Sequence, residues 1–541
     1  MLVEAPAFDP ANATREHQER QAGYNCDFTG FLPHTRGGDE SDRGLLCVSF
    51  EYPDVTMMVP PFDGRSYDRR LADMLLASHG LGVVEVSRGA DGRWGYRSGG
   101  ARNRRVTPFS TLELRGPVAG HDRMKTRAHP DGRRVHGTVF NCSGGLTPWG
   151  TWLQAEENFH VYFRLSRGNR DSWLAKNAAR QGIGERSAWA FERFHDRFDL
   201  DREPNEANRF GWIVELDPYD PSSPAVKRTA LGRFHHEAAS VAITPKGHAA
   251  VYMGDDAAFE YVYKFVSEGR FDPDRGAANG DLLDRGRLYA ARFDDDGTGR
   301  WLPLVFGEGP LTKANGFADQ ADVLLRTREA ADAVGATPMD RPEDVEATPA
   351  DGRVFIACTG SGSRTAAQID SANPRAPNRD GHVIEIVEDG GDGASTTFKW
   401  DILLLCGPAS RGADYGGHTD ASPLSRPDNL AIDPAGNLWV ATDGQEGAVG
   451  ANDGAYLVPI DGKERGRSRQ LLSSVPGAEV TGPSFTPDGT TMFVAIQHPG
   501  SVGRGSSYTN PGTRWPDRDP TLPPRPSVIA VTREDGGVVG A

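Results

Sequence analysis

The chain has 541 residues, with 60 Lys and Arg against 75 Asp and Glu, which gives a formal net charge of −15. This charge opposes nucleic-acid binding as a main activity, because a phosphate backbone is bound by a basic surface. No apolar run approaches the length of a membrane span, and the N-terminus lacks the basic, apolar and cleavage segments of a signal peptide. We therefore expect a protein that binds neither nucleic acid nor a membrane and carries no export signal.

Glycine and proline are abundant, with 65 Gly and 38 Pro, and they lack the period of collagen. This usage is typical of many turns between short strands, and predicts a turn-rich β protein. The five cysteines include no Cys-x-x-Cys pair, which argues against a zinc ribbon or a thioredoxin motif. Because their number is odd, at least one thiol is unpaired.

The N-terminal part, up to about residue 130, alternates short apolar runs with Gly, Pro and Asp turns. Each run resembles a strand or one arm of a hairpin. We expect an N-terminal extension over about residues 1–45 and one short helix over residues 67–79, where the apolar residues have helical spacing.

Residues 141–158, NCSGGLTPWGTWLQAEEN, combine small-residue turns, two tryptophans, a cysteine and two adjacent carboxylates. Gly144 and Gly145 allow a close backbone approach or a positive φ. Cys142 and Glu157 supply one soft and one hard donor atom. The stretch is consistent with a functional loop, and equally with a turn that packs a buried free cysteine as a small hydrophobe.

Two segments with helical spacing follow, near residues 164–197 and near residues 314–334. Their aromatic and aliphatic residues are more typical of a core than of a cofactor site. We expect two helical insertions that pack over a channel mouth or an outer rim.

One hairpin unit recurs along the chain: a short apolar segment, a turn of the Pro-x-Gly or Pro-x-x-Gly type, and an alternating strand that ends in a polar cluster. Repeated hairpins joined by variable insertions predict a β-propeller, whose blades bury their faces only by packing around an axis. We therefore expect residues 1–541 to form a single propeller domain. The five copies are HPDGRRVHGTVFNC from His129, ITPKGHAAVYMGDD from Ile243, ATPADGRVFIACTG from Ala347, IDPAGNLWVATDG from Ile432 and FTPDGTTMFVAIQHPG from Phe485.

Four of these turns are preceded by a carboxylate at a matched distance. Glu343 and Asp428 lie six residues before the turn proline, and Glu237 and Glu479 lie eight residues before it. Six and eight have the same parity, so in strands all four side chains would point to one face. Inner propeller strands line a central channel, and the spacing therefore predicts a metal site in that channel.

Several long motifs resemble those of the PhoX-type alkaline phosphatases and occur in the same order, from about residue 130 to residue 500. The motifs are NCSGGLTPWGTWLQAEEN, GRFHHEAA, MDRPEDVEATP, RPDNLAIDPAGNLWVATDG and TGPSFTPDGTTMFVAIQHPG. The resemblance implies an all-β fold, a six-bladed β-propeller with helical insertions. It also implies hydrolysis of phosphate monoesters at alkaline pH by an iron and calcium cluster in the channel. Family members are typically exported, and without a signal peptide here the sequence leaves localisation open.

The resemblance also implies roles for individual residues. Cys142 would bind iron, as Fe3+, through its thiolate, and the other implied metal ligands are carboxylates and one amide. Arg341 would bind the substrate phosphate, and Arg341 and Glu343 are the expected catalytic residues. The implied ligands are Cys142, Glu157, Glu237, Glu343, Asp428, Asn429 and Glu479. One soft thiolate among hard oxygens is the donor set that a mixed iron and Ca2+ cluster requires.

Two other functions remain open at this point. A calcium-dependent lactonase or arylesterase also uses channel carboxylates, although calcium has no use for the Cys142 thiolate. A non-catalytic binding propeller is the second alternative, because a fold does not guarantee chemistry. No serine lies in a nucleophile-elbow context, and His235, His236 and His498 are weaker candidates for a proton donor. We expect a monomer, because the blades of a propeller close on themselves.

Overall fold

Glycines with positive φ close the repeated hairpin turns. In the turns that end at Gly150, Gly247, Gly436 and Gly489, φ lies between 68° and 85°, and each glycine N–H donates to the carbonyl three residues earlier. Only glycine adopts this conformation without steric cost, which is why the sequence repeats Pro-x-Gly. The turns bring consecutive strands into antiparallel pairs.

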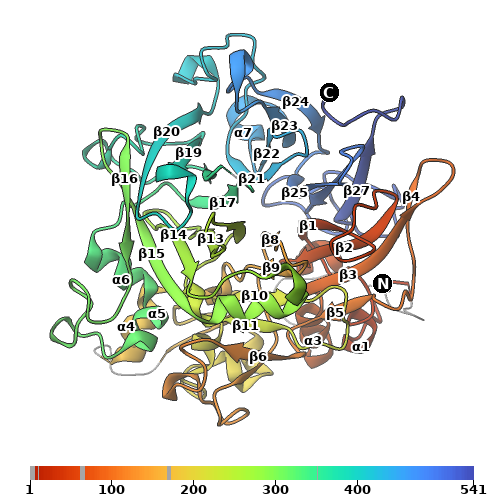
Figure 1. Cartoon of the computed structure of the whole chain (residues 1–541). Helices are drawn as coiled ribbons and strands as arrows, with labels where there is room; N and C mark the ends of the chain where they lie inside the picture. Colours follow the sequence, from red (N-terminus) through yellow and green to blue (C-terminus); the bar gives the residue numbers. More distant parts are fainter. Residues whose placement is uncertain (1–6, 10, 61–67, 167–171, 350) are drawn as a thin grey trace.

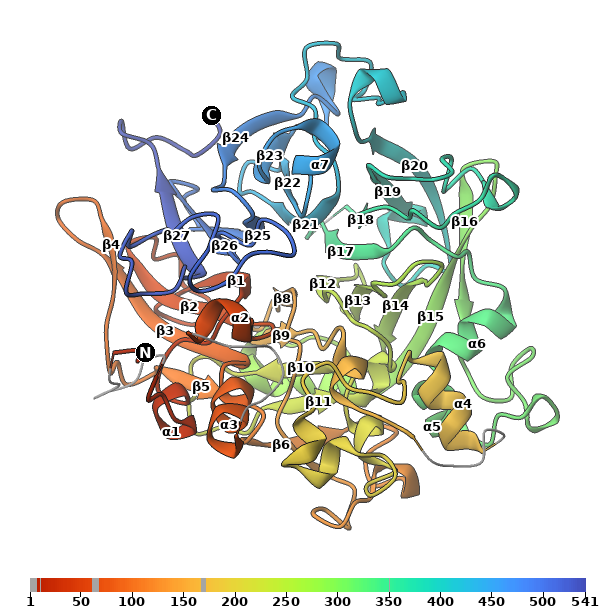
Figure 2. The ribbon, with the colours of Figure 1, turned by 180° about the vertical axis from the view of Figure 1, so that it is seen from behind.

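The computed structural model describes residues 7–9, 11–60, 68–166, 172–349 and 351–541. It shows six β-sheet blades around a central axis, as Figure 1 and the reverse view in Figure 2 show. The predicted propeller with helical insertions is therefore confirmed. In five blades the inner strand is followed along the chain by its neighbours, moving outward.

The first three blades take these strands. Blade 1 contains β1 (Cys26–Pro33), β2 (Arg43–Phe50), β3 (Gly80–Arg88), β4 (Trp94–Tyr96) and β5 (Arg104–Val106). Blade 2 contains β8 (Gly144–Leu146), β9 (Trp152–Gln154), β10 (Ile213–Leu216), β11 (Val226–Arg228) and, outermost, β6 (Thr111–Arg115) and β7 (Arg134–His136). Blade 3 contains β12 (Ser240–Ile243), β13 (Ala249–Gly254), β14 (Val262–Ser267) and β15 (Gly286–Phe293).

The remaining blades follow in chain order, and β16 (Thr298–Pro303) joins blades 3 and 4 by pairing with both β15 and β20. Blade 4 contains β17 (Pro342–Ala347), β18 (Arg353–Cys358), β19 (His382–Glu388) and β20 (Thr397–Leu405). Blade 5 contains β21 (Pro427–Ile432), β22 (Leu438–Thr442), β23 (Gly454–Val458) and β24 (Arg469–Ser473). Blade 6 contains β25 (Glu479–Phe485), β26 (Thr491–Gln497) and β27 (Ser527–Thr532).

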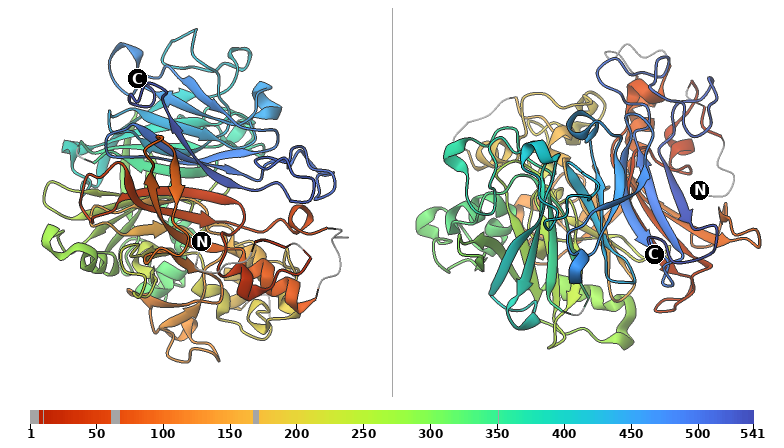
Figure 3. Two further views of the ribbon diagram at one scale, coloured as in Figure 1. Left: turned by 90° about the vertical axis from the view of Figure 1, so that its right-hand side faces the viewer. Right: turned by 90° about the horizontal axis from the view of Figure 1, so that it is seen from above.

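The ring closes where the first blade meets the last, and Figure 3 shows the red strands of blade 1 beside the blue strands of blade 6. Phe31 stacks on Phe493 with 5.5 Å between ring centroids. The Thr481 hydroxyl donates to the carbonyl oxygen of Asp27 at 2.8 Å. Residues from β1 through β5 thus form a blade, and the predicted extension over residues 1–45 is wrong from Cys26 onward. The sign in the sequence was the near-continuous apolar run of β2, which is typical of a fully buried strand.

The helices are short and lie outside the inner strands. They are α1 (Arg15–Gln18), α2 (Val55–Met58), α3 (Arg69–Ala77), α4 (Trp173–Arg180), α5 (Gln320–Leu325), α6 (Thr327–Val334) and α7 (Glu446–Val449). Helix α4 of the first predicted insertion packs on α5 and α6 of the second, where Asn177 donates to the Leu325 carbonyl at 3.3 Å. In the part of the chain that is described, no helix is long and apolar enough to cross a membrane.

The hairpin predicted at His129 is not an inner hairpin. Its strand, β7, is the outermost strand of blade 2 and pairs with β6. The inner turn of blade 2 is instead the segment from Thr147 to Gly150, which closes β8 onto β9. Both segments contain a proline two residues before a glycine. The sequence therefore does not distinguish the inner turn from the outer one, and only their positions in the folded sheet do.

Candidate metal centre

The inner strands bring most of the predicted ligands to one end of the channel. Cys142 lies just before β8 and Glu237 just before β12. Glu343, Asp428 and Glu479 lie within the first two residues of β17, β21 and β25. All of these side chains belong to residues that are at least 93 % buried. The channel end therefore gathers acidic and thiol groups from blades 2 to 6.

The direction of these side chains is set by irregular strand pairing and not by regular alternation along a strand. The register shifts between Pro342 and Val345 in β17, and between Pro427 and Leu430 in β21. A β-bulge of this kind adds a residue to one strand and redirects its side chains. The assumption of strict parity was therefore wrong, because Glu343 and Asp428 lie inside the bulges and Glu237 lies outside its strand.

Among the described residues, four groups of three side chains place their donor atoms within 4.8 Å of one another. Two of the groups share Cys142 and two share Glu237, so three of the four groups are contiguous. The fourth adjoins them electrostatically, since Asp428 and Asp27 both act on Glu479. The groups are Asp27, Glu51 and Cys142; Cys142, Glu157 and Glu237; Glu237, Asp256 and Glu343; and Asp443, Glu479 and His498.

Four acidic members of these groups were missed in the sequence: Asp27, Glu51, Asp256 and Asp443. Asp27 lies six residues before Pro33, the spacing already noted for Glu343. The other three follow the second strand of a blade by one or two residues, after β2, β13 and β22. An acid directly after these three second strands was a readable signal, but it indicates a ligand only once the inner strands are known to meet.

Several carboxylate oxygens in the centre are buried without a protein partner. Both oxygens of Glu237, Oδ1 of Asp27 and Oδ1 of Asp256 have no hydrogen-bond partner among the described residues. A buried ionised carboxylate without a partner is costly unless it binds a cation. One thiol among many carboxylates also offers both soft and hard donors. The residues present therefore fit a centre that holds more than one metal ion.

Arg341 is the cation that contacts this cluster directly. Its Nη2 lies 2.7 Å from Asp256 Oδ2 and 2.7 Å from Glu343 Oε1, while 40 % of its side chain is exposed. Burial alone would lower the pKa of Arg341, but the charges of Asp256 and Glu343 outweigh it and raise the pKa, so the guanidinium stays charged. Arg341 can therefore bind an anion that enters from solvent and reaches the metal ligands.

The structure places Asn429 and the three candidate histidines in different surroundings. Asn429 Oδ1 accepts from the Gly482 N–H at 3.0 Å, so its amide joins blades 5 and 6. His498 Nε2 lies 3.1 Å from Glu479 Oε2. His235 stacks on His160 with ring centroids 4.4 Å apart, and His236 Nε2 bonds the Gly232 carbonyl at 2.9 Å. Of the three histidines considered, only His498 meets a candidate ligand through its side chain.

The channel continues beyond the ligands as a cavity of about 780 Å³. Asp344 lies at the boundary, where its Oδ2 accepts from the Leu430 N–H at 3.0 Å and from the Ser143 hydroxyl at 3.3 Å. One carboxylate thus joins blades 2, 4 and 5 next to Cys142. Burial raises its pKa to about 8. Asp344 therefore places a buried polar group between the ligand cluster and the cavity.

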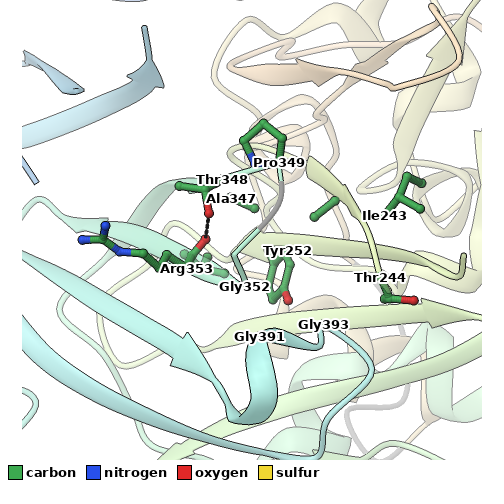
Figure 4. Close-up of a pocket in the computed structure, with 12 residues that line it drawn as sticks. Ile243, Thr244, Tyr252, Ala347, Thr348, Pro349, Gly352, Arg353, Gly391 and Gly393 are labelled. Atoms are coloured by element: carbon green, nitrogen blue, oxygen red, sulfur yellow. Dashed lines mark hydrogen bonds between the residues drawn. The ribbon is translucent and has the colours of Figure 1, made fainter. Parts of the chain in front are cut away.

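A second, much smaller cleft lies between blades 3 and 4 at their turn end (Figure 4). Thr348 donates to the Arg353 carbonyl at 3.1 Å across its wall. The described residues that line this cleft include no carboxylate, histidine or cysteine. It is therefore a packing gap and not an alternative metal site.

Burial and mutual repulsion perturb the acids of the cluster strongly. Desolvation is the main cause that raises the pKa of Glu157, Glu237, Glu343, Asp428 and Glu479 well above their ordinary values. The same cause raises the pKa of the Cys142 thiol. These groups therefore resist ionisation in the metal-free protein, and a bound cation would reverse the preference.

The metal-free protein should become less stable as pH rises. Desolvation raises the pKa of Asp27 to about 7, from an ordinary value of 3.8. A folded pKa above the unfolded value means that folding takes up a proton, so this stability is complete below about pH 4 and is lost as pH rises through about 7. Thermal unfolding between pH 5 and pH 8, with and without chelator, measures the effect. An equal pH slope in both samples would contradict it.

Comparisons with known proteins agree with this geometry. The family model described as alkaline phosphatase PhoX matches residues 1–500. The structure of Pseudomonas fluorescens PhoX in complex with vanadate, a transition-state analogue, is 40% identical, with a TM-score of 0.92 over 100% of this chain and 94% of that chain. Comparison with curated proteins gives no match.

Other solved structures are much more distant. The periplasmic gluconolactonase of Pseudomonas aeruginosa is 10% identical, with a TM-score of 0.32 over 94% of this chain and 88% of that chain. A putative 6-phosphogluconolactonase of Bacteroides fragilis is 11% identical, with a TM-score of 0.31 over 86% of this chain and 75% of that chain. The buried channel ligands and the full-length matches together place the chain in the PhoX alkaline phosphatase family, and it is a metal-dependent phosphatase.

Proposed function

We propose that this phosphatase hydrolyses phosphate monoesters with a cluster of iron and calcium ions held at the ligand end of the channel. The observation that carries the proposal is the buried Cys142 thiol in contact with carboxylates, some of whose oxygens have no protein partner. A thiolate suits iron, and carboxylate oxygens suit Ca2+. A site for calcium alone would have no use for Cys142, which disfavours the lactonase alternative.

The ligands would come from every blade. We assign the thiolate and carboxylates of Cys142, Glu157, Glu237, Glu343, Asp428 and Glu479, and add Asp27, Glu51, Asp256 and Asp443. Asn429 is better placed to hold Gly482 than to bind a metal. When bound, metal ions would neutralise phosphate charge and lower the pKa of a water molecule.

The residues of the chain position and neutralise the substrate. Arg341 would bind the oxygens of the transferring phosphoryl group, where negative charge develops. Glu343 holds the Arg341 guanidinium at 2.7 Å and so fixes its direction. His498 lies beside Glu479 and exposes a fifth of its side chain, which would allow contact with a leaving alcohol.

The proposal is tested by metal content together with activity. We expect the purified protein to contain both iron and calcium by plasma mass spectrometry. Removing them with a chelator should lower kcat/KM for p-nitrophenyl phosphate at alkaline pH by at least about 100-fold, because the ions supply most of the charge neutralisation. Vanadate should inhibit the loaded enzyme, since it binds Pseudomonas fluorescens PhoX.

Controls separate metal loss from unfolding. Adding back both ions should restore activity, and thermal unfolding should show that the chelated protein remains folded at the assay temperature. Calcium without iron in the active protein would contradict the mixed cluster. Metal-free protein with full activity would contradict the proposed function as a whole.

A further inference from the structure

Two arginines occupy equivalent positions in neighbouring blades. Arg341 begins the segment Arg-Pro-Glu-Asp before β17, and Arg426 begins Arg-Pro-Asp-Asn before β21. Both adopt positive φ, 57° and 54°. Each is followed by a bulge at the same register, and each carbonyl accepts a backbone N–H from the end of the second strand, from Thr359 and from Asp443. The backbone therefore presents both arginines in the same way.

Their side chains differ. The Arg341 guanidinium is paired with Asp256 and Glu343, but Arg426 is exposed. Throughout the described ranges, the Arg426 guanidinium forms no hydrogen bond or ion pair with another side chain or carbonyl. A left-handed conformation is unfavourable for arginine, and such conformations cluster at ligand sites when surrounding bonds hold them. Here the Asp380 carbonyl holds the Arg426 N–H at 2.7 Å.

The Arg426 guanidinium lies at the rim of the metal centre. A Cβ atom built on Gly444 would come within 2.6 Å of its Nη1, so the side chain passes directly over this glycine. Gly444 follows Asp443, which belongs to one of the ligand groups. The absence of a side chain at residue 444 thus leaves room for Arg426 beside the mouth.

We propose that Arg426 is a specificity-determining residue that binds a second anionic group, a phosphate or a carboxylate, on the leaving-group side of the substrate. This proposal rests on the proposed phosphatase function. Arg341 contacts the carboxylates at the centre and serves the transferring phosphoryl group, while Arg426 lies farther out and is free for the remainder of the molecule. The preferred substrates are therefore monoesters whose leaving group is itself charged.

The charge of the whole chain supports this role. The chain has a net charge of −15, so a substrate with an additional negative charge is repelled on approach. An unpaired guanidinium offsets this repulsion and offers two parallel N–H donors that match a carboxylate or phosphate. An arginine already paired within the protein would provide neither the free positive charge nor the free N–H donors.

The test compares two substrates that differ only in the distal group. Both 3-phosphoglycerate and glycerol 3-phosphate present a primary phosphate ester, and only the former carries a carboxylate. We expect Arg426→Ala to lower the ratio of their kcat/KM values about tenfold, as for loss of a charge-assisted hydrogen bond. Arg426→Lys should fall between, because it keeps the charge and loses the paired donors. The preference of the wild type should weaken with added salt.

Controls distinguish this contact from general damage. Alanine has the same difficulty with positive φ as arginine, so Arg426→Ala adds no new backbone demand. Arg287→Ala, which removes an exposed arginine on β15, should leave the substrate ratio unchanged. Inhibition by inorganic phosphate should change less than about threefold in Arg426→Ala, because that ion occupies the inner position.

Each outcome is decisive. An unchanged ratio in Arg426→Ala, with wild-type activity on both substrates, overturns the role of Arg426 and leaves the phosphatase function intact. A large loss of phosphate inhibition would also overturn it, because Arg426 would then act on the centre itself. Metal-containing wild-type protein that hydrolyses p-nitrophenyl phosphate but neither ester overturns this inference alone, and protein that hydrolyses none of the three overturns the proposed function as well.

Discussion

Replacing Cys142 with serine is expected to remove the proposed iron and to lower kcat/KM for p-nitrophenyl phosphate by about 10³-fold, because bound ions would neutralise phosphate charge and activate a water molecule. Cys142 contributes the only sulfur to the two ligand groups in which it occurs. Serine offers a neutral hydroxyl that does not ionise at neutral pH, so the soft donor is lost while the hard carboxylates remain. Iron and calcium contents per chain should therefore respond differently, with iron falling first.

The matched control for this substitution is Cys406→Ser. Cys406 is also a buried free cysteine, and it packs in a hydrophobic cluster shared by blades 4 and 5, away from the ligand groups. It should lose stability, because a hydroxyl is placed in an apolar site, and keep its iron. If Cys142→Ser kept both iron and activity, the assignment of Cys142 as a ligand would fail.

Arg341→Ala is expected to lower kcat/KM by about 10²- to 10³-fold, the range found when one preorganised donor to a developing anion is removed. The guanidinium lies 2.7 Å from carboxylates of both blade 3 and blade 4. The substitution would remove the proposed phosphate contact, and it leaves Asp256 and Glu343 without their counter-charge. Arg341→Lys should recover part of the activity, because it restores the charge without the planar pair of donors.

Steady-state kinetics and metal analysis on the same samples distinguish loss of the phosphate contact from loss of bound metal. If Arg341 binds the transferring group, vanadate inhibition should weaken while iron remains bound. Arg353→Ala provides the control, since Arg353 pairs with Glu385 at 2.5 Å on the same blade, near the turn that closes β17 onto β18. It should affect unfolding but not kcat/KM. Normal vanadate inhibition in Arg341→Ala would exclude the proposed role of Arg341.

The sequence by itself determined the local parts of this protein. Gly247 and Gly436 occupy turns that require positive φ, so Pro-x-Gly marks a tight turn without showing whether that turn is inner or outer. The resemblance of the motifs around Cys142, Glu343 and Asp428 also indicated the phosphatase family, which the full-length comparisons confirm. These features are readable because each depends on residues within a few positions of one another.

Only the tertiary structure decided which acids meet. Asp27 and Asp443 come from opposite parts of the chain, yet both act on Glu479 once blade 1 closes against blade 6. Local spacing could not separate the inner turn at Gly150 from the outer segment at His129, and bulges in β17 and β21 replaced the expected alternation. The physical reason is that a propeller channel is formed by inner strands from different blades, so its ligands are neighbours in space and remote in sequence.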